Sequence, residues 1–168
     1  KTVRSAMVQE VVGKPRLDQL PILKCWPEDG GRFVTLPLVM SKDPKTGAGN
    51  MGMYRMQVYD QATTGMHMQI QKGGGFHYQN AEKMGQPLEM AVAVGGDPSL
   101  ILAAIMPLPE GLDEVAFSGI VRGQRTPMVR AKSIDMKVPA QAEFIFEGVL
   151  RPGVRRLEGP FGDHFGHY

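Results

Sequence analysis

Alternation of apolar and polar residues with a period of two is the feature that most constrains how this chain folds. The pattern runs through FVTLPLVM (33–40), MGMYRMQVYD (51–60) and GMHMQIQK (65–72). Such alternation is typical of strands with one buried face and one polar face. Because only the short turn QATT separates the last two stretches, they are predicted to form a hairpin. Its apolar face would carry Tyr54, Met56, Val58, Met66, Met68 and Ile70, and its polar face Arg55, Gln57, His67, Gln69 and Gln71.

The rest of the chain mixes helices with strands. Asp97 followed by Pro98 is a typical helix start, because an aspartate caps free backbone amides and a proline fits the first turn. The expected elements are a short helix over 79–86, a strand over 89–96, a helix from Asp97, a helix over 111–122, and strands over 126–139 and 141–152. This order predicts one α+β domain over residues 1–168, with a mostly antiparallel, split-barrel-like sheet and a few packed helices.

The composition is that of a globular protein with a nearly neutral charge. The net charge is +2 and the basic residues are scattered, which argues against a nucleic-acid-binding surface. The longest apolar stretch, LILAAIMPLP (100–109), is too short to span a bilayer. The single cysteine, Cys25, excludes an internal disulfide and indicates a reducing, cytoplasmic environment. Because the chain begins without methionine and closes on RRLEGPFGDHFGHY (155–168), we expect it to be a fragment of a longer chain.

Residues that could carry chemistry are ambiguous when each is taken alone. Glu158 and Asp163 flank a Gly-Pro-Phe-Gly turn, where carboxylates are commonly solvated. The four histidines lack the spacing of a zinc motif. The glycines at 73–75 open no G-x-G-x-x-G fingerprint, although a glycine-rich bend lets backbone amides approach a phosphate.

Four stretches taken together change this interpretation. They are N50-M-G-M-Y-R55, the Q71-K-G-G run, MPLPEGLDE (106–114) and E158-G-P-F-G-D163. In this order and at these separations they resemble the central domain of the UbiD family, over nearly the whole chain from about Thr35 to Tyr168. The resemblance implies a reversible, non-oxidative decarboxylase (a lyase) that uses prenylated flavin mononucleotide (prenylated FMN) and acts on aromatic or other α,β-unsaturated carboxylic acids.

The resemblance also implies a divalent metal, Mn²⁺ or Mg²⁺ with K⁺ as an optional further ion, that bridges to the flavin phosphate. Its ligands would be Asn50, Gln71 and Glu114, with Gln71 standing where the family has histidine. A glutamine oxygen is an acceptable ligand for these hard cations but a weaker one than imidazole for manganese, so the site is expected either to bind more weakly or to have lost tight binding. Flavin contacts are implied for Thr35, Met53, Tyr54, Arg55, His67, Met68, Gln69, Lys72, Gly73, Met106 and Pro107.

The implied catalytic trio is Glu158, Arg55 and Asp163. Arg55 carries a permanent charge, so it can keep one carboxylate ionised and orient the substrate. The second carboxylate has to donate a proton to the carbon that has lost carbon dioxide, and we assign this role to Asp163. That role requires a raised pKa, as burial or a neighbouring like charge provides.

The substrate and the assembly stay open at this stage. The acid could be a polyprenyl-hydroxybenzoate of ubiquinone biosynthesis, a naphthoate of menaquinone biosynthesis, or a simpler aromatic acid. Expected partners are that acid, a flavin prenyltransferase as cofactor supplier, further copies of the full-length chain, and a membrane surface if the substrate is polyprenylated. The alternatives are a non-catalytic flavin-phosphate-binding module, or one component of a split or multi-subunit decarboxylase. A weaker one is an ordinary split-barrel flavin reductase.

Overall fold

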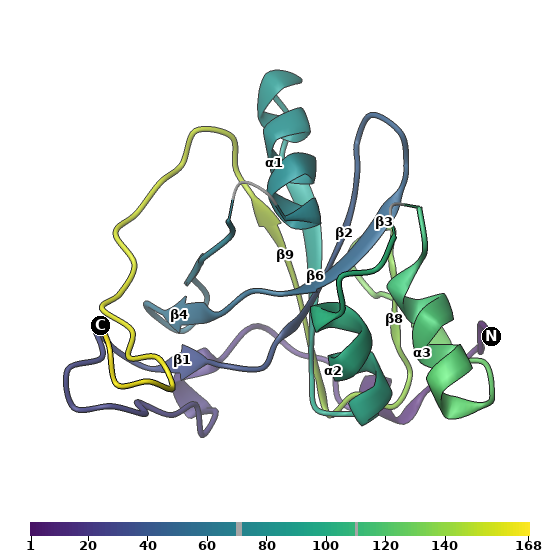
Figure 1. The fold of residues 1–168 in the computed structure, drawn as a ribbon, viewed down its shortest axis with the longest axis horizontal. Helices are drawn as coiled ribbons and strands as arrows, with labels where there is room; N and C mark the ends of the chain where they lie inside the picture. Colours follow the sequence, from purple (N-terminus) through teal and green to yellow (C-terminus); the bar gives the residue numbers. More distant parts are fainter. Residues whose placement is uncertain (70–71, 110) are drawn as a thin grey trace.

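Four antiparallel strands form the centre of the molecule in the computed structural model, which describes residues 1–69, 72–109 and 111–168 (Figure 1). Their order is β3-β2-β6-β9. The bounds are β2 Leu38–Lys42, β3 Gly49–Met53, β6 Leu88–Val94 and β9 Phe144–Leu150. The register pairs Met40 with both Met51 and Ala91, which aligns the apolar positions of neighbouring strands. The antiparallel α+β class predicted from the sequence is thus the one observed.

Two smaller sheets flank the central one. The first has the order β1-β4-β5, and the second pairs β7 with β8. Their bounds are β1 Phe33–Val34, β4 Met56–Val58, β5 Thr64–Met66, β7 Met128–Arg130 and β8 Lys137–Pro139. The helices are α1 Gly73–Lys83, α2 Pro98–Ile105 and α3 Glu114–Arg122, with 3-10 turns at Met7–Gln9 and Leu17–Gln19. None of the helices in the described ranges is long and apolar enough to cross a membrane.

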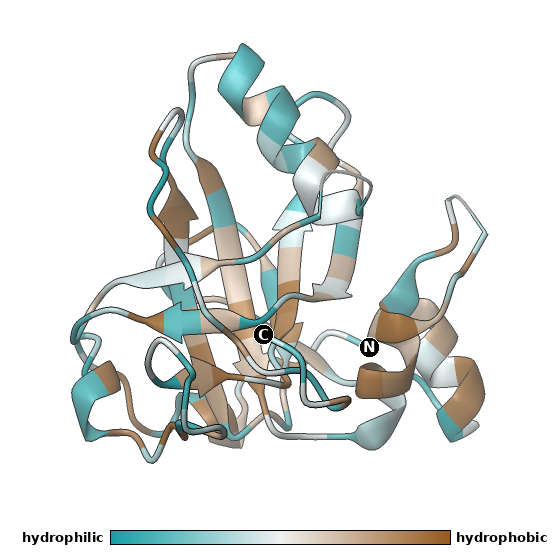
Figure 2. Cartoon of the chain, turned by 60° about the vertical axis from the view of Figure 1, so that its left-hand side comes forward, coloured by the Kyte–Doolittle hydropathy of each residue, from teal (hydrophilic) through white to brown (hydrophobic). Residues whose placement is uncertain are grey.

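The two faces of the central sheet bury separate hydrophobic clusters. Alternate residues of β2 take part in them: Leu38 and Met40 in one cluster, and Val39 in the other. Helix α2 contributes Leu100 to the first cluster, and α1 contributes Ala81 to the second. Burial on both faces explains why β6 reads as an almost continuous apolar run. Helix α1 has few buried residues and is mostly hydrophilic, as the upper helix of Figure 2 shows.

Several predicted elements are confirmed. Met56 pairs with Met66 and Val58 with Thr64, so β4 and β5 form the predicted hairpin. Asp97 caps α2 through a hydrogen bond that its side chain accepts from Ser99 N, with Pro98 in the first turn. Residues 70 and 71, at the end of the hairpin's predicted second arm, lie outside the described residues.

Other predicted boundaries are wrong. The stretch 33–40 is two strands in different sheets, because the chain turns at 35–37, where Pro37 lacks an amide hydrogen for pairing. The stretch 51–60 also divides, with β3 in the central sheet and β4 in the flanking one. The stretch 126–139 is a pair of short strands joined by 131–136. Helix α3 begins at Glu114 and not at 111, because Asp113 caps it by accepting a hydrogen bond from Ala116 N.

Helix α1 is the largest difference from the sequence prediction. It begins at Gly73, six residues before the predicted start, although glycine disfavours helix interiors. Tertiary contacts offset this cost. Gly74 N donates to the Tyr54 hydroxyl (3.1 Å), and the buried His77 ring bonds to Ser41 Oγ of β2 (2.8 Å). The glycines are required because the Tyr54 ring lies against Gly74, where an added Cβ would lie 2.9 Å from the ring.

The same ring also covers Gly52 of β3, where an added Cβ would overlap the Tyr54 hydroxyl, whereas Gly49 on the same strand faces open space. Gly52→Ala is therefore expected to lower the free energy of unfolding by about 1–3 kcal/mol, the usual cost of overpacking. Gly49→Ala is the matched control and should change it by less than about 0.5 kcal/mol. Urea titration of both variants measures the difference, and equal effects would contradict the assigned packing of Tyr54.

Candidate cofactor and active site

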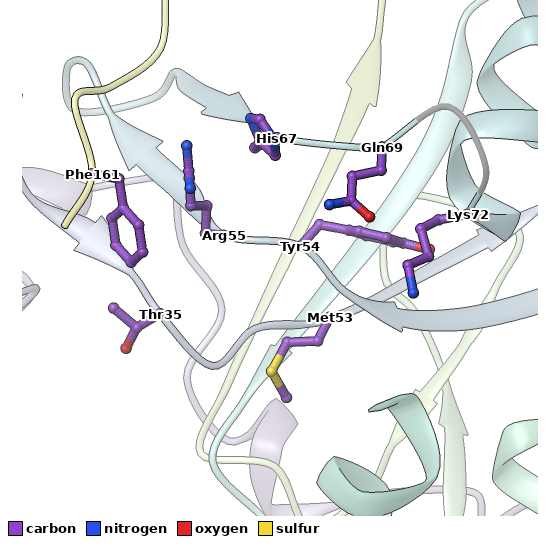
Figure 3. Close-up of a pocket in the computed structure, with 8 residues that line it drawn as sticks. All are labelled: Thr35, Met53, Tyr54, Arg55, His67, Gln69, Lys72 and Phe161. Atoms are coloured by element: carbon purple, nitrogen blue, oxygen red, sulfur yellow. The ribbon is translucent and has the colours of Figure 1, made fainter. Parts of the chain in front are cut away.

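A cavity of about 310 Å³ opens where the chain passes from the central sheet to the flanking sheet (Figure 3). Most of its lining residues lie in segments that join or end strands, and the others come from the start of α1 and from the loop at 158–163. They are Thr35, Met53, Tyr54, Arg55, His67, Gln69, Lys72 and Phe161. Thr35 lies between β1 and β2, while Tyr54 and Arg55 join β3 to β4. The strand breaks that the sequence alone did not predict therefore create this site, since they turn side chains of both sheets toward one space.

Seven of the residues predicted to contact a flavin line this cavity together. Gly73 begins the neighbouring helix α1, and Met68 packs against the hydrophobic cluster beneath it. Met106 and Pro107 follow the end of α2 and are not among the lining residues. The contacts of all these residues with a flavin stay predictions.

An ion pair between Arg55 and Glu158 borders the cavity. Arg55 Nε donates to Glu158 Oε1 (2.8 Å) and its Nη2 donates to Oε2 (2.9 Å), which is the two-pronged geometry that guanidinium and carboxylate favour. His67 Nδ1 lies 3.3 Å from the same Oε2. Burial alone would raise the pKa of Glu158, but the hydrogen bonds and charge of Arg55 outweigh it and hold that pKa below its usual value. Glu158 is therefore ionised at neutral pH.

Phe161 was not singled out from the sequence, although it stands inside the E-G-P-F-G-D stretch. Its ring packs edge-on against Phe33 of β1, with 4.8 Å between the ring centroids. The Arg55 guanidinium lies 4.5 Å from the same ring centroid, within the range of a cation–π contact. Figure 3 shows the two side chains next to each other at one end of the cavity. Arg55 is thus fixed from two directions by residues of one short loop.

Asp163 does not lie among the residues that line the cavity. Its Oδ1 accepts hydrogen bonds from the backbone amides of His167 (2.9 Å) and Phe165 (2.8 Å), which close a turn at 163–167. The His167 amide in particular, together with that of Phe165, lowers the pKa of Asp163. The proton-donor role assigned from the sequence needs a raised pKa, so this arrangement is the opposite of the one expected for that role.

Asn50 and Glu114, two of the predicted metal ligands, lie close to each other. Glu114 Oε2 accepts from Met51 N (3.1 Å), the residue next to Asn50. Asn50 Nδ2 donates to the Tyr54 hydroxyl (3.4 Å), and an added Cβ on Gly73 would overlap Asn50 Oδ1. Burial raises the pKa of the Glu114 carboxyl above its usual value. The third predicted ligand, Gln71, lies outside the described residues, and these contain no group of three or more His, Cys, Asp or Glu side chains placed to hold a metal.

These positions agree with a phosphate and a cation beside the first turn of α1. The side chain of Lys72, the N-cap residue, makes no capping hydrogen bond to this turn. Only a glycine at position 73 leaves room for the amide oxygen of Asn50. The positive end of the helix dipole favours an anion there. The oxygen donors of Asn50 and Glu114 are the kind that Mg²⁺ and Mn²⁺ prefer. The described residues therefore fit the implied group.

Comparisons with known proteins define the class. A family profile described as "UbiD: 3-octaprenyl-4-hydroxybenzoate carboxy-lyase Rift-related domain" matches residues 1–168. The chain therefore belongs to the UbiD family.

Two relatives illustrate the similarity in sequence. An uncharacterised protein of Archaeoglobus fulgidus is 52% identical over 169 residues, covering all of this chain and 35% of that protein. A Chlamydia pneumoniae protein, named as one of the subunits of a 4-hydroxybenzoate decarboxylase, is 47% identical over 152 residues, covering 90% of this chain and 26% of that protein. The chain thus spans about a third or less of the length of these relatives.

Solved structures share the fold. The closed form of Sedimentibacter hydroxybenzoicus vanillic acid decarboxylase matches with a TM-score of 0.94 and 29% identity, over 99% of this chain and 37% of that one. An evolved dimeric form of the UbiD-class enzyme HmfF from Pelotomaculum thermopropionicum, in complex with prenylated FMN, matches with a TM-score of 0.88 and 32% identity, over 93% and 36% of the two chains.

The lowered pKa of Glu158 predicts a pH-dependent contribution to stability. A carboxyl group with a depressed folded-state pKa stabilises the fold above the usual glutamate pKa and loses this contribution as the pH falls through the depressed value. Glu158→Gln should therefore be less stable than wild type at neutral pH, and the difference should shrink at acidic pH. Urea titrations across a pH series measure it, with the exposed Glu10→Gln as the control for removing one charge. A difference that does not vary with pH would contradict the ion pair.

Proposed function

We propose that this chain forms the cofactor-binding and catalytic core of a UbiD-type carboxy-lyase, which decarboxylates an aromatic or α,β-unsaturated carboxylic acid reversibly and without net oxidation. The observation that carries the proposal is the two-pronged Arg55–Glu158 pair at the border of a cavity lined by the residues implied for flavin contact. The names of the relatives support an aromatic acid as substrate, since one belongs to a 4-hydroxybenzoate decarboxylase and another is a vanillic acid decarboxylase.

Prenylated FMN is the proposed cofactor, and when bound it supplies an electron sink for the pair of electrons left by the departing carboxylate. Asn50, Glu114 and the first turn of α1 would hold its phosphate and a Mn²⁺ or Mg²⁺ ion. The apolar Met53 and the half-exposed side chains of His67 and Gln69 would border the ring system. The binding of prenylated FMN to the solved HmfF structure supports this assignment.

The chain's own residues supply charge, orientation and protons. Arg55 has a fixed positive charge and further guanidinium donors toward the cavity, so it binds the carboxylate of the substrate while Glu158 keeps its plane in place. Glu158, ionised and largely shielded from water, raises the pKa of any second carboxyl group brought beside it. Asp163 is proposed as that group. It has to leave the amides of Phe165 and His167 and take up a proton at its carboxyl oxygen, which it then donates to the substrate carbon.

A second function has specific support. The Chlamydia pneumoniae relative is named as one subunit of a decarboxylase, so the chain can equally be part of an enzyme whose activity needs another polypeptide. In that case the flavin binds, but turnover requires the added polypeptide.

The catalytic assignment is tested by reconstituting the complete gene product with prenylated FMN and Mn²⁺ and measuring carbon dioxide release from a panel of hydroxybenzoates. Asp163→Asn should lower kcat by about 100-fold or more, the usual worth of a proton donor, while flavin binding is retained. Asp135→Asn, which removes an exposed carboxylate on a distant loop, is the control. Wild-type protein that binds the flavin yet releases no carbon dioxide from any acid, with or without added subunits, would overturn the proposed function.

The metal assignment is tested at the position where this chain departs from its family. Gln71→His replaces an amide oxygen with an imidazole and should tighten Mn²⁺ binding in the flavin complex, because manganese binds imidazole more strongly. Titration followed by the paramagnetic signal of free Mn²⁺ measures the affinity, and Gln79→His on the exposed face of α1 is the control. Equal affinities for wild type and Gln71→His would remove Gln71 from the ligand set.

A further inference from the structure

The loop that carries Glu158 is held by two buried polar side chains that play no part in the proposed chemistry. Gln57 of β4 is 6% exposed and Asp29 is 3% exposed. A buried amide or carboxylate is costly unless its hydrogen bonds are made, so the partners of both groups identify what they do.

Gln57 joins the loop to the N-terminal part of the chain with both ends of its side-chain amide. Its Oε1 accepts from Gly159 N (2.8 Å), and its Nε2 donates to Gly30 O (3.0 Å). Gly159 is adjacent to Glu158, so the first of these bonds fixes the backbone directly beside the ion-paired carboxylate. Arg55 and Gln57 are two residues apart in an extended segment and therefore point to the same side. One reaches the carboxylate of Glu158 and the other the next backbone amide.

Asp29 holds the other end of the same loop. Its Oδ1 accepts from Gly162 N (2.8 Å), and its Oδ2 accepts from Trp26 N (2.9 Å). Burial alone would raise the pKa of Asp29, but the amides of Gly162 and Trp26 lower it, so the group is a charged acceptor. Gly30, the next residue, donates its amide to Pro160 O (2.7 Å). The loop is thus tied at 159, 160 and 162 by residues 29, 30 and 57.

The two segments approach each other closely at two glycines. An added Cβ on Gly30 would overlap Gly159 O, and one on Gly162 would lie 2.6 Å from the Trp26 ring. Between the two anchors stands Phe161, whose ring contacts Phe33 and the Arg55 guanidinium. Loss of either anchor would therefore displace both the carboxylate and the ring that hold Arg55.

We propose that Gln57 and Asp29 are positioning residues, which act through the 158–163 loop to set the geometry of the Arg55–Glu158 pair. The inference rests on the proposed function for its kinetic consequence, whereas its structural consequence is independent of that function. Displacement of a catalytic group by about 1 Å can lower kcat by about 100-fold. The loss should therefore appear in turnover and leave flavin binding unchanged, because the residues proposed to hold the phosphate and the metal lie near the Tyr54 hydroxyl, away from this loop.

The structural test is hydrogen–deuterium exchange of the complete gene product, followed in peptides that cover 157–163. Gln57→Met keeps the side-chain volume and removes both hydrogen bonds, so exchange at Gly159 should accelerate by at least about ten-fold. Asp29→Asn is the milder variant. It keeps one acceptor oxygen for two amides, so exchange should accelerate at Gly162 or at Trp26, and a peptide that covers Trp26 is followed as well. Gln61→Met and Asp135→Asn, both on exposed positions, are the controls and should leave these peptides unchanged. Unchanged exchange in folded Gln57→Met and Asp29→Asn proteins would overturn the inference.

The kinetic test is a double-mutant cycle with Glu158→Gln. Gln57→Met should lower kcat by about 10- to 100-fold in the wild-type background, with the flavin dissociation constant within about two-fold. In the Glu158→Gln background the fold-loss should be clearly smaller, because the ion pair whose geometry Gln57 sets is already broken. Equal fold-losses in both backgrounds would show a purely structural role and overturn the inference. A wild-type protein with no turnover would instead overturn the proposed function, while the exchange measurement still decides the positioning role.

Discussion

The ion pair between Arg55 and Glu158 is the interaction on which the arrangement of the site depends. It joins two segments 103 residues apart in the chain, and neither segment has a regular structure that would place its side chain alone. Arg55 is placed by the crossing from β3 to β4, and Glu158 by a loop anchored on buried side chains. An isolated surface pair of this type contributes little to stability. Here Glu158 is largely buried and Arg55 is also held by an aromatic ring, so the pair is a fixed element of the cavity wall.

The opposite end of the cavity is organised by a neutral group, the Tyr54 hydroxyl. It accepts hydrogen bonds from Asn50 and from the first turn of α1, and two glycines give its ring the space to lie between strand and helix. A single buried tyrosine thereby aligns a strand, a helix start and an amide side chain. Because Asn50 donates its Nδ2 to this hydroxyl, its Oδ1 is left facing Gly73. The Arg55–Glu158 pair and the Tyr54 hydroxyl thus organise separate ends of one cavity, with Lys72 as a second cationic side chain at the Tyr54 end.

Period-two alternation was enough to predict the antiparallel α+β class and the β4–β5 hairpin, and local chemistry was enough for the Asp97 cap. The sequence prediction failed at the start of α1. Helix propensity counts three glycines against a helix there, whereas the contacts of Tyr54 and His77 stabilise the helix. The alternation pattern also missed the breaks at Thr35 and Tyr54, where the chain passes from one sheet to another. A strand that continues in one sheet and two strands in different sheets have the same alternating pattern. The resemblance singled out Arg55, Glu158 and Asp163, and their roles stay predictions. The structure pairs the first two, whereas the local turn that engages Asp163 did not follow from the resemblance. Gln57 and Asp29 gave no signal, because their partners lie 102 and 133 residues away in the chain.

The long separations between these partners also affect how the protein is made. The segment between β3 and β4, which carries Arg55, is synthesised about 100 residues before the loop that carries Glu158. During that interval a nascent chain has an unpaired Arg55 and an incomplete cavity wall. Closing a loop of this length has an entropic cost that only the finished contacts offset. The site is therefore expected to order after both faces of the central sheet are covered. A ligand that binds before residues 155–168 are synthesised would meet only the Asn50 end of the cavity, because the wall that carries Glu158 and Phe161 is still missing.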